Sequence, residues 1–372
     1  MLNIFYVNLI TFDNAGGIEN FNKTFLKALS QIENVKATSV SVYDSADKKN
    51  IIKGVEFQYF HGNKYQRYLR VLKYLIFSLR RIDILILAHI HLIPIALIIK
   101  ILRPNLKIYL NAYGIEVWRI MPFFYRLFLK NIRIFSISTY TTDTLIKFNP
   151  YIKKEQFFYL PPDTDMKVHQ SLESPYEVGK YNLLTVSRLT INDRYKGVDS
   201  MIKTLPLIIN KIQNIKYFII GEGNDRGRLE ELVDKLGLRE YVEFKGFVDQ
   251  LEVYYEYCDV FALPSKGEGF GIVYIEAMKY HKPCIACNVG GATDVVIADE
   301  TGLTCDYDDQ QSLASSILTF YENRKLAKKY GENGHKHLLK NFTFDKFKNR
   351  LLLEFKEDLS ELKFYESTNK VL

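Results

Sequence analysis

The sequence predicts an α/β fold with two doubly wound domains, each built on a parallel sheet. Along nearly the whole chain, short apolar runs of strand length alternate with segments of helical spacing, which is typical of parallel sheets covered on both faces. A polar, proline-containing stretch from Leu160 to Lys180 interrupts this alternation near the middle of the chain. The length of 372 residues, of which 47% are apolar and 25% charged, suits two ordinary globular domains and excludes a disordered chain or a small disulfide scaffold.

The first half opens on an apolar run, Asn3–Asn8, followed by a glycine loop at 14–17 and by helical spacing over Ile18–Leu29. The most apolar stretch, Ile84–Ile99, has only 16 residues and contains two histidines and a proline. Because a membrane-spanning helix needs about 20 predominantly apolar residues, this stretch predicts a buried strand followed by a helix. The further strand candidates of this half are Ser39–Tyr43, Ile84–Leu87, Lys107–Leu110 and Ile132–Ile137.

After the interruption the alternation restarts. We expect an N-terminal domain over residues 1–165 and a C-terminal domain over residues 166–349. The last helix, from Phe344 to about Phe364, is long enough to pack back across the hinge, and we expect the chain at about 350–372 to lie on the N-terminal domain. The strand candidates of the second half are Tyr181–Val186, Tyr217–Ile220, Val242–Phe244, Val260–Ala262 and Pro283–Ala286, and its helices are expected from about Lys196, Asp225 and Gln311.

The net charge of +7 is unevenly distributed along the chain. Between Phe60 and Tyr140 there are thirteen Lys and Arg but only two acids, Asp83 and Glu116, so this window alone carries +11 among many Tyr, Phe and Leu residues. Such a window suits an anionic membrane surface, a phosphorylated ligand or nucleic acid, and the alternative is a set of solvated helix faces. Because the chain contains no recognisable nucleic-acid-binding module, we expect no nucleic-acid partner.

The sequence also bears on the compartment. Met1–Val7 lacks the basic start and long apolar run of a targeting segment. Four cysteines in 372 residues do not resemble the disulfide framework of a secreted protein. We therefore expect a cytoplasmic protein, in peripheral contact with the inner face of a membrane if the basic window binds anionic lipid.

The segment from Pro264 to Met278 carries the strongest signal of a binding site. It follows an apolar strand and predicts a helix beginning near Phe270, so glycines and free backbone N–H groups meet at a helix N-terminus, which suits a diphosphate. Glu268, in the loop, can accept hydrogen bonds from sugar hydroxyls, and Glu276, two turns inside the helix, can hold vicinal ribose hydroxyls. The alternative is a glycine turn with two solvated glutamates.

These two glutamates stand within Glu-Gly-Phe-Gly-Ile-Val-Tyr-Ile-Glu-Ala-Met, with seven residues between them. The segment resembles the signature of the retaining nucleotide-sugar glycosyltransferases of family 4, which have the GT-B architecture of two doubly wound, Rossmann-like domains facing a cleft. Further segments of the C-terminal half match this family in the expected order: Val186–Leu189 with Lys196–Gly197, Ile220–Gly223, Gly246–Val248, Val289–Asp294 and Thr301–Leu303. In the N-terminal half, Gly16–Glu19, Ala88–His89 and Tyr113–Trp118 resemble the loops that face the cleft.

The resemblance implies a donor site in the C-terminal domain and an acceptor site in the N-terminal domain. Arg188 and Lys196 would hold the donor diphosphate, Glu268 would orient the donor sugar, Glu276 would hold the ribose, and His89 is a further catalytic candidate. The other donor-binding candidates are Gly17, Gly223, Gly246, Phe247, Gly269, Phe270, Gly271 and Ile272. The acceptor-side candidates are Gly16, Glu19, His91, Tyr113 and Glu116.

The chain departs from the family pattern at three places. Tyr113 stands where a histidine is usual, and because a tyrosine does not titrate near neutrality, we expect it to shape the acceptor site differently. Asp294 replaces a commoner glutamate, and Pro161-Pro162 replaces Asn-Gly at the hinge. None of these changes removes a residue that the donor chemistry needs.

Together these features predict a retaining, metal-independent hexosyltransferase. It would move a sugar from a UDP- or GDP-sugar to a saccharide acceptor in the synthesis of exopolysaccharide, capsule or lipopolysaccharide. We expect this acceptor to be linked to a lipid. No cofactor is expected, because two cations and backbone amides can stabilise the leaving diphosphate without a metal. No acceptor-side carboxylate stands out as a nucleophile, so we hypothesise front-face substitution assisted by the departing phosphate. The alternatives are a nucleotide-sugar epimerase of the same architecture and a non-catalytic scaffold subunit that binds nucleotide-sugar.

Two further patterns are weaker. Cys284 and Cys287 have the spacing of a metal or redox pair, but residues three apart on a strand point to opposite faces, so we expect no metal there. Asp163 and Asp165 have the spacing of a metal-binding acidic pair, but they lie in the predicted linker, where acids are usually solvated.

Overall fold

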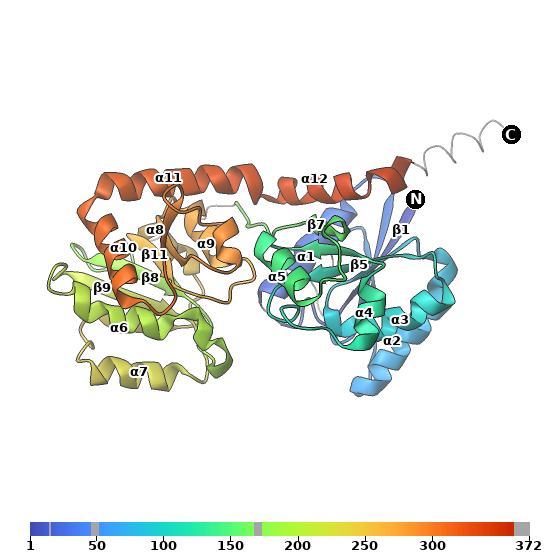
Figure 1. Cartoon of the computed structure of the whole chain (residues 1–372), viewed down its shortest axis with the longest axis horizontal. Helices are drawn as coiled ribbons and strands as arrows, with labels where there is room; N and C mark the ends of the chain where they lie inside the picture. Colours follow the sequence, from blue (N-terminus) through green and yellow to red (C-terminus); the bar gives the residue numbers. More distant parts are fainter. Residues whose placement is uncertain (15, 46–51, 167–172, 361–372) are drawn as a thin grey trace. The chain divides into compact units, whose positions relative to one another are not determined.

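The structure is a computed structural model that describes residues 1–14, 16–45, 52–166 and 173–360. The chain divides into two compact units. Unit 1 combines Met1–Asp163 with the chain from Phe344 onward, and unit 2 is Thr164–Thr343. Each unit contains one parallel sheet with helices packed against it (Figure 1). The predicted α/β class with two parallel-sheet domains is confirmed.

The sheet of unit 1 has seven strands, and every neighbouring pair in it is parallel. The strands are β1 (Leu2–Asn8), β2 (Val35–Ser41), β3 (Val55–Gln58), β4 (Ile84–Leu87), β5 (Lys107–Ala112), β6 (Arg133–Ser136) and β7 (Phe157–Tyr159). Their order in the sheet is β3-β2-β1-β4-β5-β6-β7, so the direction of winding reverses between β1 and β4. In such open sheets, ligands bind beyond the carboxyl ends of the strands at the point of reversal.

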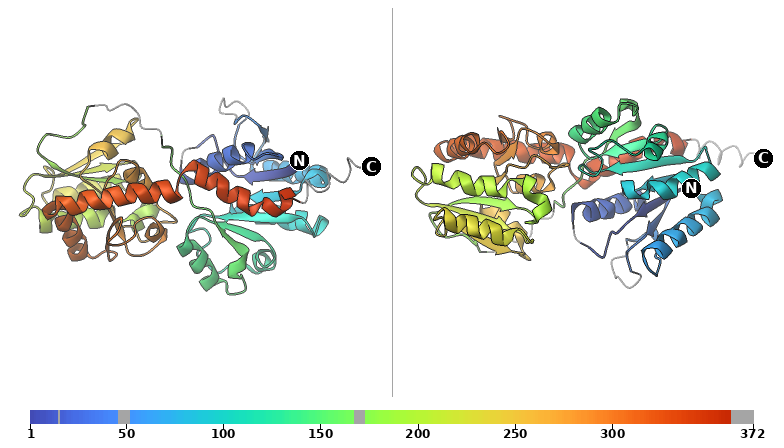
Figure 2. Two further views of the ribbon diagram at one scale, coloured as in Figure 1. Left: turned by 90° about the horizontal axis from the view of Figure 1, so that it is seen from above. Right: turned by 60° about the horizontal axis from the view of Figure 1, so that its bottom comes forward.

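Helices cover both faces of this sheet. The helices α2 (Lys64–Ser78), α3 (Ile93–Leu102), α4 (Phe123–Leu129) and α5 (Thr139–Phe148) share one apolar core with the strands. α3 packs against both α2 and α4, and the right-hand view of Figure 2 brings α2 and α3 in front of the sheet. The other face is covered by α1 (Gly17–Ser30) and α12 (Phe344–Glu354), which pack against each other.

Aromatic side chains attach α12 to the rest of unit 1. Phe347 packs edge-on against the rings of Phe21 and Phe25 in α1, with centroids 5.3 and 5.9 Å apart. Phe355, eight residues further on, packs edge-on against Tyr109 of β5, with centroids 5.7 Å apart. Residues at this spacing lie on one side of a helix, so the segment that returns to unit 1 is amphipathic, and it begins at Phe344 as predicted.

Unit 2 contains a six-stranded sheet, again with every neighbouring pair parallel. The strands are β8 (Tyr181–Val186), β9 (Ile215–Ile220), β10 (Val242–Gly246), β11 (Val260–Leu263), β12 (Cys284–Cys287) and β13 (Gly302–Cys305). Their order is β10-β9-β8-β11-β12-β13, which reverses between β8 and β11. The helices are α6 (Val198–Ile208), α7 (Arg226–Lys235), α8 (Leu251–Tyr257), α9 (Ile272–Lys279), α10 (Gln310–Glu322) and α11 (Arg324–Asn341).

The sequence pattern is least informative at the edges of the sheets. It does not predict β3, β7 or β13, each of which is an edge strand of three or four residues. Short edge strands are stabilised by pairing with a neighbour, so their own apolar pattern is weak. It also places β2 at Ser39–Tyr43, whereas the strand runs from Val35 to Ser41. The expectations for Ala15 in the glycine loop and for residues 361–372 in the last helix lie outside the described residues.

The apolar stretch Ile84–Ile99 folds as predicted, into the strand β4 and most of α3, with a short helical turn between them. All four residues of β4 are buried. Of the helices that the structure describes, none combines the length and the apolar character that crossing a membrane requires.

Candidate functional site

In unit 2 most candidate residues lie at the carboxyl ends of the strands and in the loops that follow them, and Ile272 and Glu276 lie on α9. Three of these loops, which follow β8, β11 and β12, approach one another backbone to backbone. A Cβ on Gly197 would lie 2.4 Å from the carbonyl oxygen of Pro264, and one on Gly291 would lie 1.9 Å from that of Gly269. Gly197 also has a φ of +74°, which favours glycine. Glycine therefore allows the three loops to form one surface, because a larger residue would hold their backbones apart.

Lys196 and Glu268 form a direct ion pair, with Lys196 Nζ 2.5 Å from Glu268 Oε1. Both side chains are largely buried, with exposures of 15% and 10%. Lys196 ends a short 3-10 helix after β8, and Glu268 lies in the loop after β11, so the fold joins two residues that are 72 positions apart. Since neither charge is well solvated, each depends on the other for its stabilisation.

Arg188 follows β8 and is tied to this surface by Asp193. The guanidinium of Arg188, with 73% of its side chain exposed, donates a hydrogen bond from Nη2 to Asp193 Oδ1 at 3.1 Å. The buried carboxylate of Asp193 also accepts hydrogen bonds from the hydroxyls of Thr190, at 2.7 Å, and Tyr195, at 3.0 Å. The ring of Tyr195 lies against Gly267, where a Cβ would approach it to 2.5 Å. Asp193 therefore links Arg188 to the glycine loop after β11.

That glycine loop leads into α9, which begins at Ile272 with Gly271 as its N-cap residue at a φ of +95°. The helix thus starts two residues later than predicted. Gly269 is half-buried at the backbone contact with the loop after β12. The side chain of Phe270 is buried and packs edge-on against Phe342, with ring centroids 5.1 Å apart. The side chain of Phe270 therefore belongs to the core, and its backbone remains the predicted donor contact.

Glu276 lies on α9 and accepts a hydrogen bond at its Oε2 from the hydroxyl of Tyr255 in α8, at 2.8 Å. The side chain is half-buried, and this loss of solvation raises the pKa of Glu276 to about 7. Its carboxyl group therefore gains and loses a proton near neutral pH. A ligand whose hydroxyls donate hydrogen bonds to this group would favour its ionised form.

The loops after β9 and β10 lie at the same end of the sheet. The amide of Gly221 donates a hydrogen bond to the carbonyl of Gly246 at 2.9 Å, and a Cβ on Gly223 would lie 2.1 Å from the carbonyl oxygen of Leu189. These contacts connect both loops to the one that carries Arg188. Phe247, the next residue after Gly246, exposes 81% of its surface, and an aromatic ring of this kind can stack on a planar group.

In unit 1, His89 and His91 follow β4, beside the point where the winding of the sheet reverses. The Nδ1 of His89 accepts a hydrogen bond from the backbone N–H of His91 at 3.2 Å, and the two ring centroids are 4.5 Å apart. Desolvation, and then the neighbouring His91, lower the pKa of His89 to about 4. His89 is therefore neutral at pH 7 and carries its proton on Nε2, so it can donate one hydrogen bond.

The glycine loop of unit 1 leads from β1 into α1. Gly16 is the N-cap residue of α1, Gly17 is its exposed first residue, and Glu19 lies in its first turn. The buried carboxylate of Asp44 holds the preceding chain by accepting backbone hydrogen bonds. The donors are the amides of Thr11, Phe12 and Asp13, at 2.8 to 3.0 Å.

Tyr113 and Glu116 serve the structure of the loop after β5. The buried hydroxyl of Tyr113 donates a hydrogen bond to Asn22 Oδ1 and accepts one from Asn111 Nδ2, both at 3.1 Å. Glu116 accepts hydrogen bonds from the amides of Tyr113 and Gly114, at 2.7 and 3.2 Å. The Tyr113 hydroxyl is thus engaged in the buried polar network beneath α1, and the contribution of Tyr113 and Glu116 to an acceptor site stays a prediction.

All four cysteines are buried free thiols. Cys284 and Cys287 stand at the two ends of β12, and Cys287 is in register with Cys305 of β13. Within the described ranges, no group of three or more His, Cys, Asp and Glu side chains is placed so that it could hold a metal ion.

Known proteins resemble both the sequence and the fold. Residues 173–337 match the family described as Glycosyl transferases group 1. An uncharacterized glycosyltransferase of Methanocaldococcus jannaschii is 30% identical over 228 residues, which cover 59% of this chain and 60% of that protein. A GDP-mannose-dependent alpha-(1-6)-phosphatidylinositol monomannoside mannosyltransferase of Mycobacterium tuberculosis is 30% identical over 227 residues, covering 56% of this chain and 57% of the relative.

The aligned segments thus span less than two thirds of either relative. The fold likeness extends further. The structure of Anabaena Alr3699/HepE in complex with UDP and glucose matches with a TM-score of 0.77 and 16% identity, covering 96% of this chain and 100% of that one. Both parallel-sheet units resemble the GT-B fold of such glycosyltransferase structures.

The family match decides the identity of most of unit 2. Residues 173–337 are a glycosyl transferases group 1 domain. This group 1 domain includes every candidate of unit 2, among them the ion pair of Lys196 and Glu268, whereas the candidates of unit 1 lie outside it. Two residues of its site, Asp193 and Tyr195, escape the sequence analysis. In the sequence they are only an acid and a tyrosine between the two predicted diphosphate cations. This local pattern does not show which side chains they contact.

Asp193 is a positioning residue of the group 1 domain by this geometry. We expect Asp193→Ala to raise the KM for nucleotide-sugar about tenfold while kcat changes less than about threefold, because Arg188 loses its tether but keeps its charge. Asp193→Asn retains one acceptor oxygen and should recover part of the loss. Steady-state kinetics with varied donor check this. The control is Asp234→Ala, which removes an exposed acid that is paired with Arg239. A lowered kcat with unchanged KM would contradict the positioning role.

Proposed function

We propose that the chain is a retaining glycosyltransferase that moves a sugar from a UDP- or GDP-sugar to a saccharide acceptor. The group 1 domain supports glycosyl transfer. The Anabaena structure with UDP supports a uridine donor, and the mannosyltransferase named for GDP-mannose supports a guanosine donor. We further propose a cytoplasmic enzyme whose acceptor is lipid-linked, as the phosphatidylinositol in that relative's name suggests, and whose product belongs to a cell-envelope polysaccharide.

The observation that carries the proposal is the placement of two cations, Arg188 and Lys196, beside the start of α9 at the carboxyl end of the unit 2 sheet. When a sugar leaves a nucleoside diphosphate, the diphosphate gains negative charge. Arg188, Lys196 and the amides at the start of α9 would oppose that charge, and this stabilisation is larger in the transition state than in the bound donor. We propose that these groups do so without a metal.

The buried ion pair suggests how the donor sugar is held. A diphosphate at this surface competes with Glu268 for Lys196. As Lys196 turns to the diphosphate, the carboxylate of Glu268 becomes free to accept hydrogen bonds from hydroxyls of the donor sugar. Donor binding would therefore replace the ion pair of Lys196 and Glu268 with two interactions, one between Lys196 and the diphosphate and one between Glu268 and the sugar. A smaller anion without a sugar would make only the first, so the site would favour the complete donor.

Two other residues would hold the nucleoside. Glu276 would accept hydrogen bonds from the vicinal ribose hydroxyls in its ionised form, while Tyr255 keeps its carboxylate in place. The exposed ring of Phe247 would stack on the base. Neither contact distinguishes uracil from guanine, so the base preference has to be measured.

In unit 1, we propose that neutral His89 donates a hydrogen bond from Nε2 to a donor or acceptor oxygen, that Gly17 contributes to donor binding, and that Gly16, Glu19 and His91 surround the acceptor. Transfer would occur by front-face substitution. The bond from the anomeric carbon to the phosphate oxygen breaks while the bond to the acceptor oxygen forms on the same face, and the acceptor proton passes to the departing phosphate. The anomeric configuration is then retained.

A donor panel tests this proposal. The protein is first incubated with UDP-glucose, UDP-galactose, UDP-N-acetylglucosamine and GDP-mannose, and a rise in its melting temperature identifies the donor. Transfer to saccharide acceptors is then followed, and NMR of the product gives the anomeric configuration. An inverted product would contradict the retaining mechanism. Epimerised sugar from donor alone would favour an epimerase, and donor binding without turnover would favour a scaffold subunit.

A further inference from the structure

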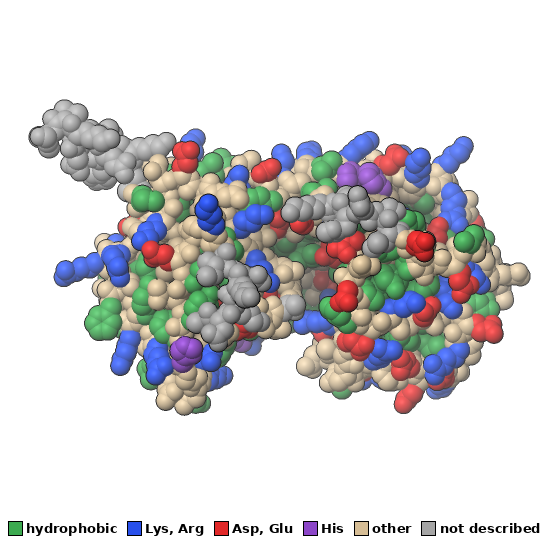
Figure 3. All heavy atoms as spheres, turned by 180° about the vertical axis from the view of Figure 1, so that it is seen from behind, with side chains coloured by type: hydrophobic (Ala, Val, Ile, Leu, Met, Phe, Trp, Pro, Cys, Tyr) green, Lys and Arg blue, Asp and Glu red, His purple; other side chains and the backbone are tan. Residues whose placement is uncertain are grey.

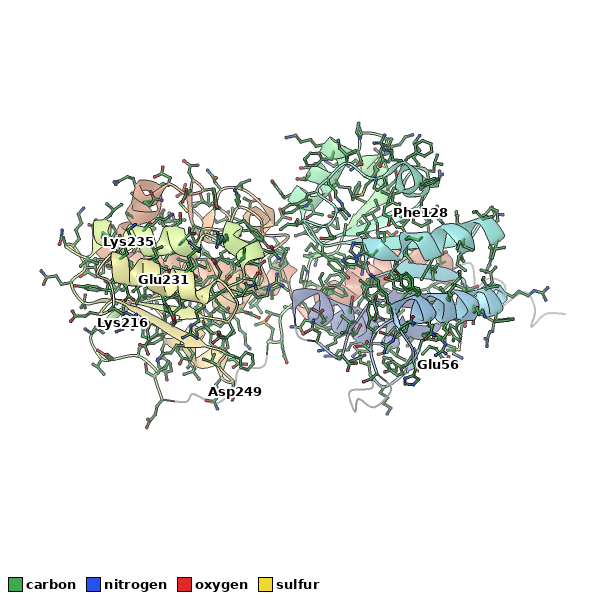
Figure 4. The ribbon with its side chains drawn as sticks, turned by 90° about the horizontal axis from the view of Figure 1, so that it is seen from below. Glu56, Phe128, Lys216, Glu231, Lys235 and Asp249 are labelled. Carbon is green, nitrogen blue, oxygen red and sulfur yellow. The ribbon has the colours of Figure 1, made fainter. Side chains whose placement is uncertain are left out.

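We propose that the outer face of α2, α3 and α4 is a docking surface for an anionic lipid bilayer. This inference deepens the proposed function, on which it rests, by assigning the surface that would bring unit 1 to a lipid-linked acceptor. The three helices lie side by side over one face of the unit 1 sheet, and Figure 4 views them from this side, with Phe128 marking α4 and Glu56 marking the neighbouring strand β3. Their inward residues belong to the core, so their outward residues are free to contact a partner.

The outward residues of α2 combine apolar side chains with cations. Tyr65, Leu69, Lys73 and Phe77 follow one another at four-residue spacing and therefore share one side of the helix. Tyr65, Leu69 and Phe77 expose 80%, 58% and 86% of their surfaces. Soluble helices normally present polar residues on the side away from the core, so this side of α2 is arranged for contact with something other than water.

The other two helices extend the apolar surface. On α3, Ile101 and Leu102 expose 76% and 51% of their surfaces. On α4, the adjacent rings of Phe123 and Phe124 expose 67% and 69%, and Leu127, one turn further, exposes 55%. Aromatic and branched aliphatic side chains of this kind bury themselves at the boundary between lipid headgroups and acyl chains.

The charges of this surface have one sign. Of the two acids between residues 60 and 140, Asp83 accepts hydrogen bonds from the backbone and side chain of Asn3, and Glu116 closes the loop after β5. Both carboxylates are thus engaged away from the outer helix faces. The exposed cations on or beside these helices are Lys64, Arg70, Lys73, Arg80, Arg81, Arg119, Arg126 and Lys130. Within the described part of the chain, none of these cations forms an ion pair with a carboxylate.

The nearest acid on β3, Glu56, is already paired with Lys36 at 2.8 Å. On the face seen in Figure 3, the surface of unit 1 (left) carries mainly blue Lys and Arg side chains, whereas red and blue side chains mix on unit 2 (right). The charge pattern therefore distinguishes unit 1 from unit 2.

An anionic bilayer matches both features of the surface. Its phosphates pair with the cations, and its interfacial region receives the apolar side chains. A second copy of the chain would bring like charges together, and a nucleic acid would satisfy the cations while leaving Ile101, Leu102 and Leu127 in water. The bilayer is the occupant that satisfies all of these groups at once.

Sedimentation with vesicles tests the inference on the full chain. Vesicles of phosphatidylcholine with phosphatidylglycerol should bind the protein at low salt, vesicles of phosphatidylcholine alone should bind it at least about tenfold more weakly, and added salt should release it. Two double variants, called the α2 variants, change α2 and the 3-10 helix Leu79–Arg81 that directly follows it. Lys73→Glu/Arg80→Glu should weaken binding at least about tenfold, since each cation near such a surface adds roughly fivefold to the affinity. Leu69→Ser/Phe77→Ser should weaken binding by a similar factor while leaving the salt dependence in place.

Matched variants on other surfaces serve as controls. Leu353→Ser removes an apolar side chain with 65% exposure from α12, and Lys235→Glu reverses an exposed charge on α7, which Figure 4 labels. Both should bind vesicles like the parent chain. Equal binding of parent and α2 variants, or vesicle binding that survives high salt unchanged, would overturn the inference. Competition with an oligonucleotide of equal charge gives a further outcome. If the oligonucleotide displaces bound vesicles, and the α2 variants lose binding to the oligonucleotide rather than to vesicles, the inference is overturned in favour of nucleic acid.

The docking surface and the proposed function fail separately. If the protein binds UDP or GDP-sugar and transfers sugar to a soluble acceptor but ignores anionic vesicles, the docking surface is wrong and the function stands. If it binds vesicles as expected but neither binds nor consumes any nucleotide-sugar, the proposed function is wrong. The α2 variants should leave transfer to a soluble acceptor within about twofold of the parent, because the substituted side chains lie outside the group 1 domain.

Discussion

Lys196→Ala should lower sugar transfer by a factor of about 10² to 10³, because the leaving diphosphate loses its most enclosed cation. The same substitution leaves Glu268 buried without a partner, which costs about 3 to 5 kcal/mol of folding stability. Loss of activity and loss of stability are thus expected together in this single variant. Transfer is measured at saturating donor, and stability by thermal unfolding.

A double variant separates the two effects. In Lys196→Ala/Glu268→Gln the buried charge is removed, so most of the stability should return while transfer stays at the level of the single variant or below. Lys203→Ala is the control, since Lys203 lies on α6 in an exposed pair with Asp199 and its loss should cost less than about 1 kcal/mol. Recovery of transfer in the double variant would show that Lys196 acts only on the fold.

Glu276→Gln should make the protein more stable at alkaline pH and lower its affinity for nucleotide. The pKa of Glu276 is about 7 in the folded chain, raised from 4.5 by burial, so the folded state holds this proton more tightly than the unfolded state does. The stabilisation is fully present below about pH 4.5 and is lost as the pH rises through about 7. Glutamine carries no proton to lose, so at about pH 8 the variant should gain roughly 2 to 3 kcal/mol over the parent, and at about pH 5 little or nothing.

Nucleotide binding should change in the opposite direction. Ribose hydroxyls favour the ionised carboxylate, so the affinity of the parent chain for UDP or GDP should rise between about pH 6 and pH 8. In Glu276→Gln the affinity should be about tenfold weaker at the upper end and nearly independent of pH. Glu231→Gln, at an exposed position on α7 that Figure 4 labels, is the control and should alter neither property. If parent and Glu276→Gln keep the same pH dependence of stability and affinity, Glu276 does not exchange its proton at this site.

Much of the group 1 domain site could be placed from the sequence because its residues lie directly after strands. Arg188 follows β8, Phe247 follows β10, and Glu268 stands in the loop after β11. In a parallel sheet the carboxyl ends of all strands meet at one edge, so strand prediction alone brings these side chains to the same edge. The sequence does not reveal contacts between side chains from distant segments. Phe270 reads as part of a glycine loop, and only its packing against Phe342 shows that it belongs to the core.

Tyr113, whose hydroxyl is buried, is a similar case. It stands at the carboxyl end of a strand, where sequence reasoning expects contact with a ligand. The structure shows its side chain in the buried polar network with Asn22 and Asn111, which come from α1 and β5. Whether a residue at the end of a strand faces a ligand or the helix layer depends on which helix covers the sheet there. For Tyr113 that helix is α1, whose Asn22 is 91 positions away in the sequence.

The sequence by itself determined the alternation of strands and helices, the division into two sheets, the family of residues 173–337 and the basic window of unit 1. These properties follow from periodicity and composition, which are local along the chain. Only the tertiary structure decided that Lys196 pairs with Glu268, that Asp193 holds Arg188, and that α2, α3 and α4 pack side by side over one face of the unit 1 sheet. Each of these features depends on contacts between different segments of the chain. Such contacts are determined by how helices, strands and loops pack, and the residue pattern within a single element does not determine them.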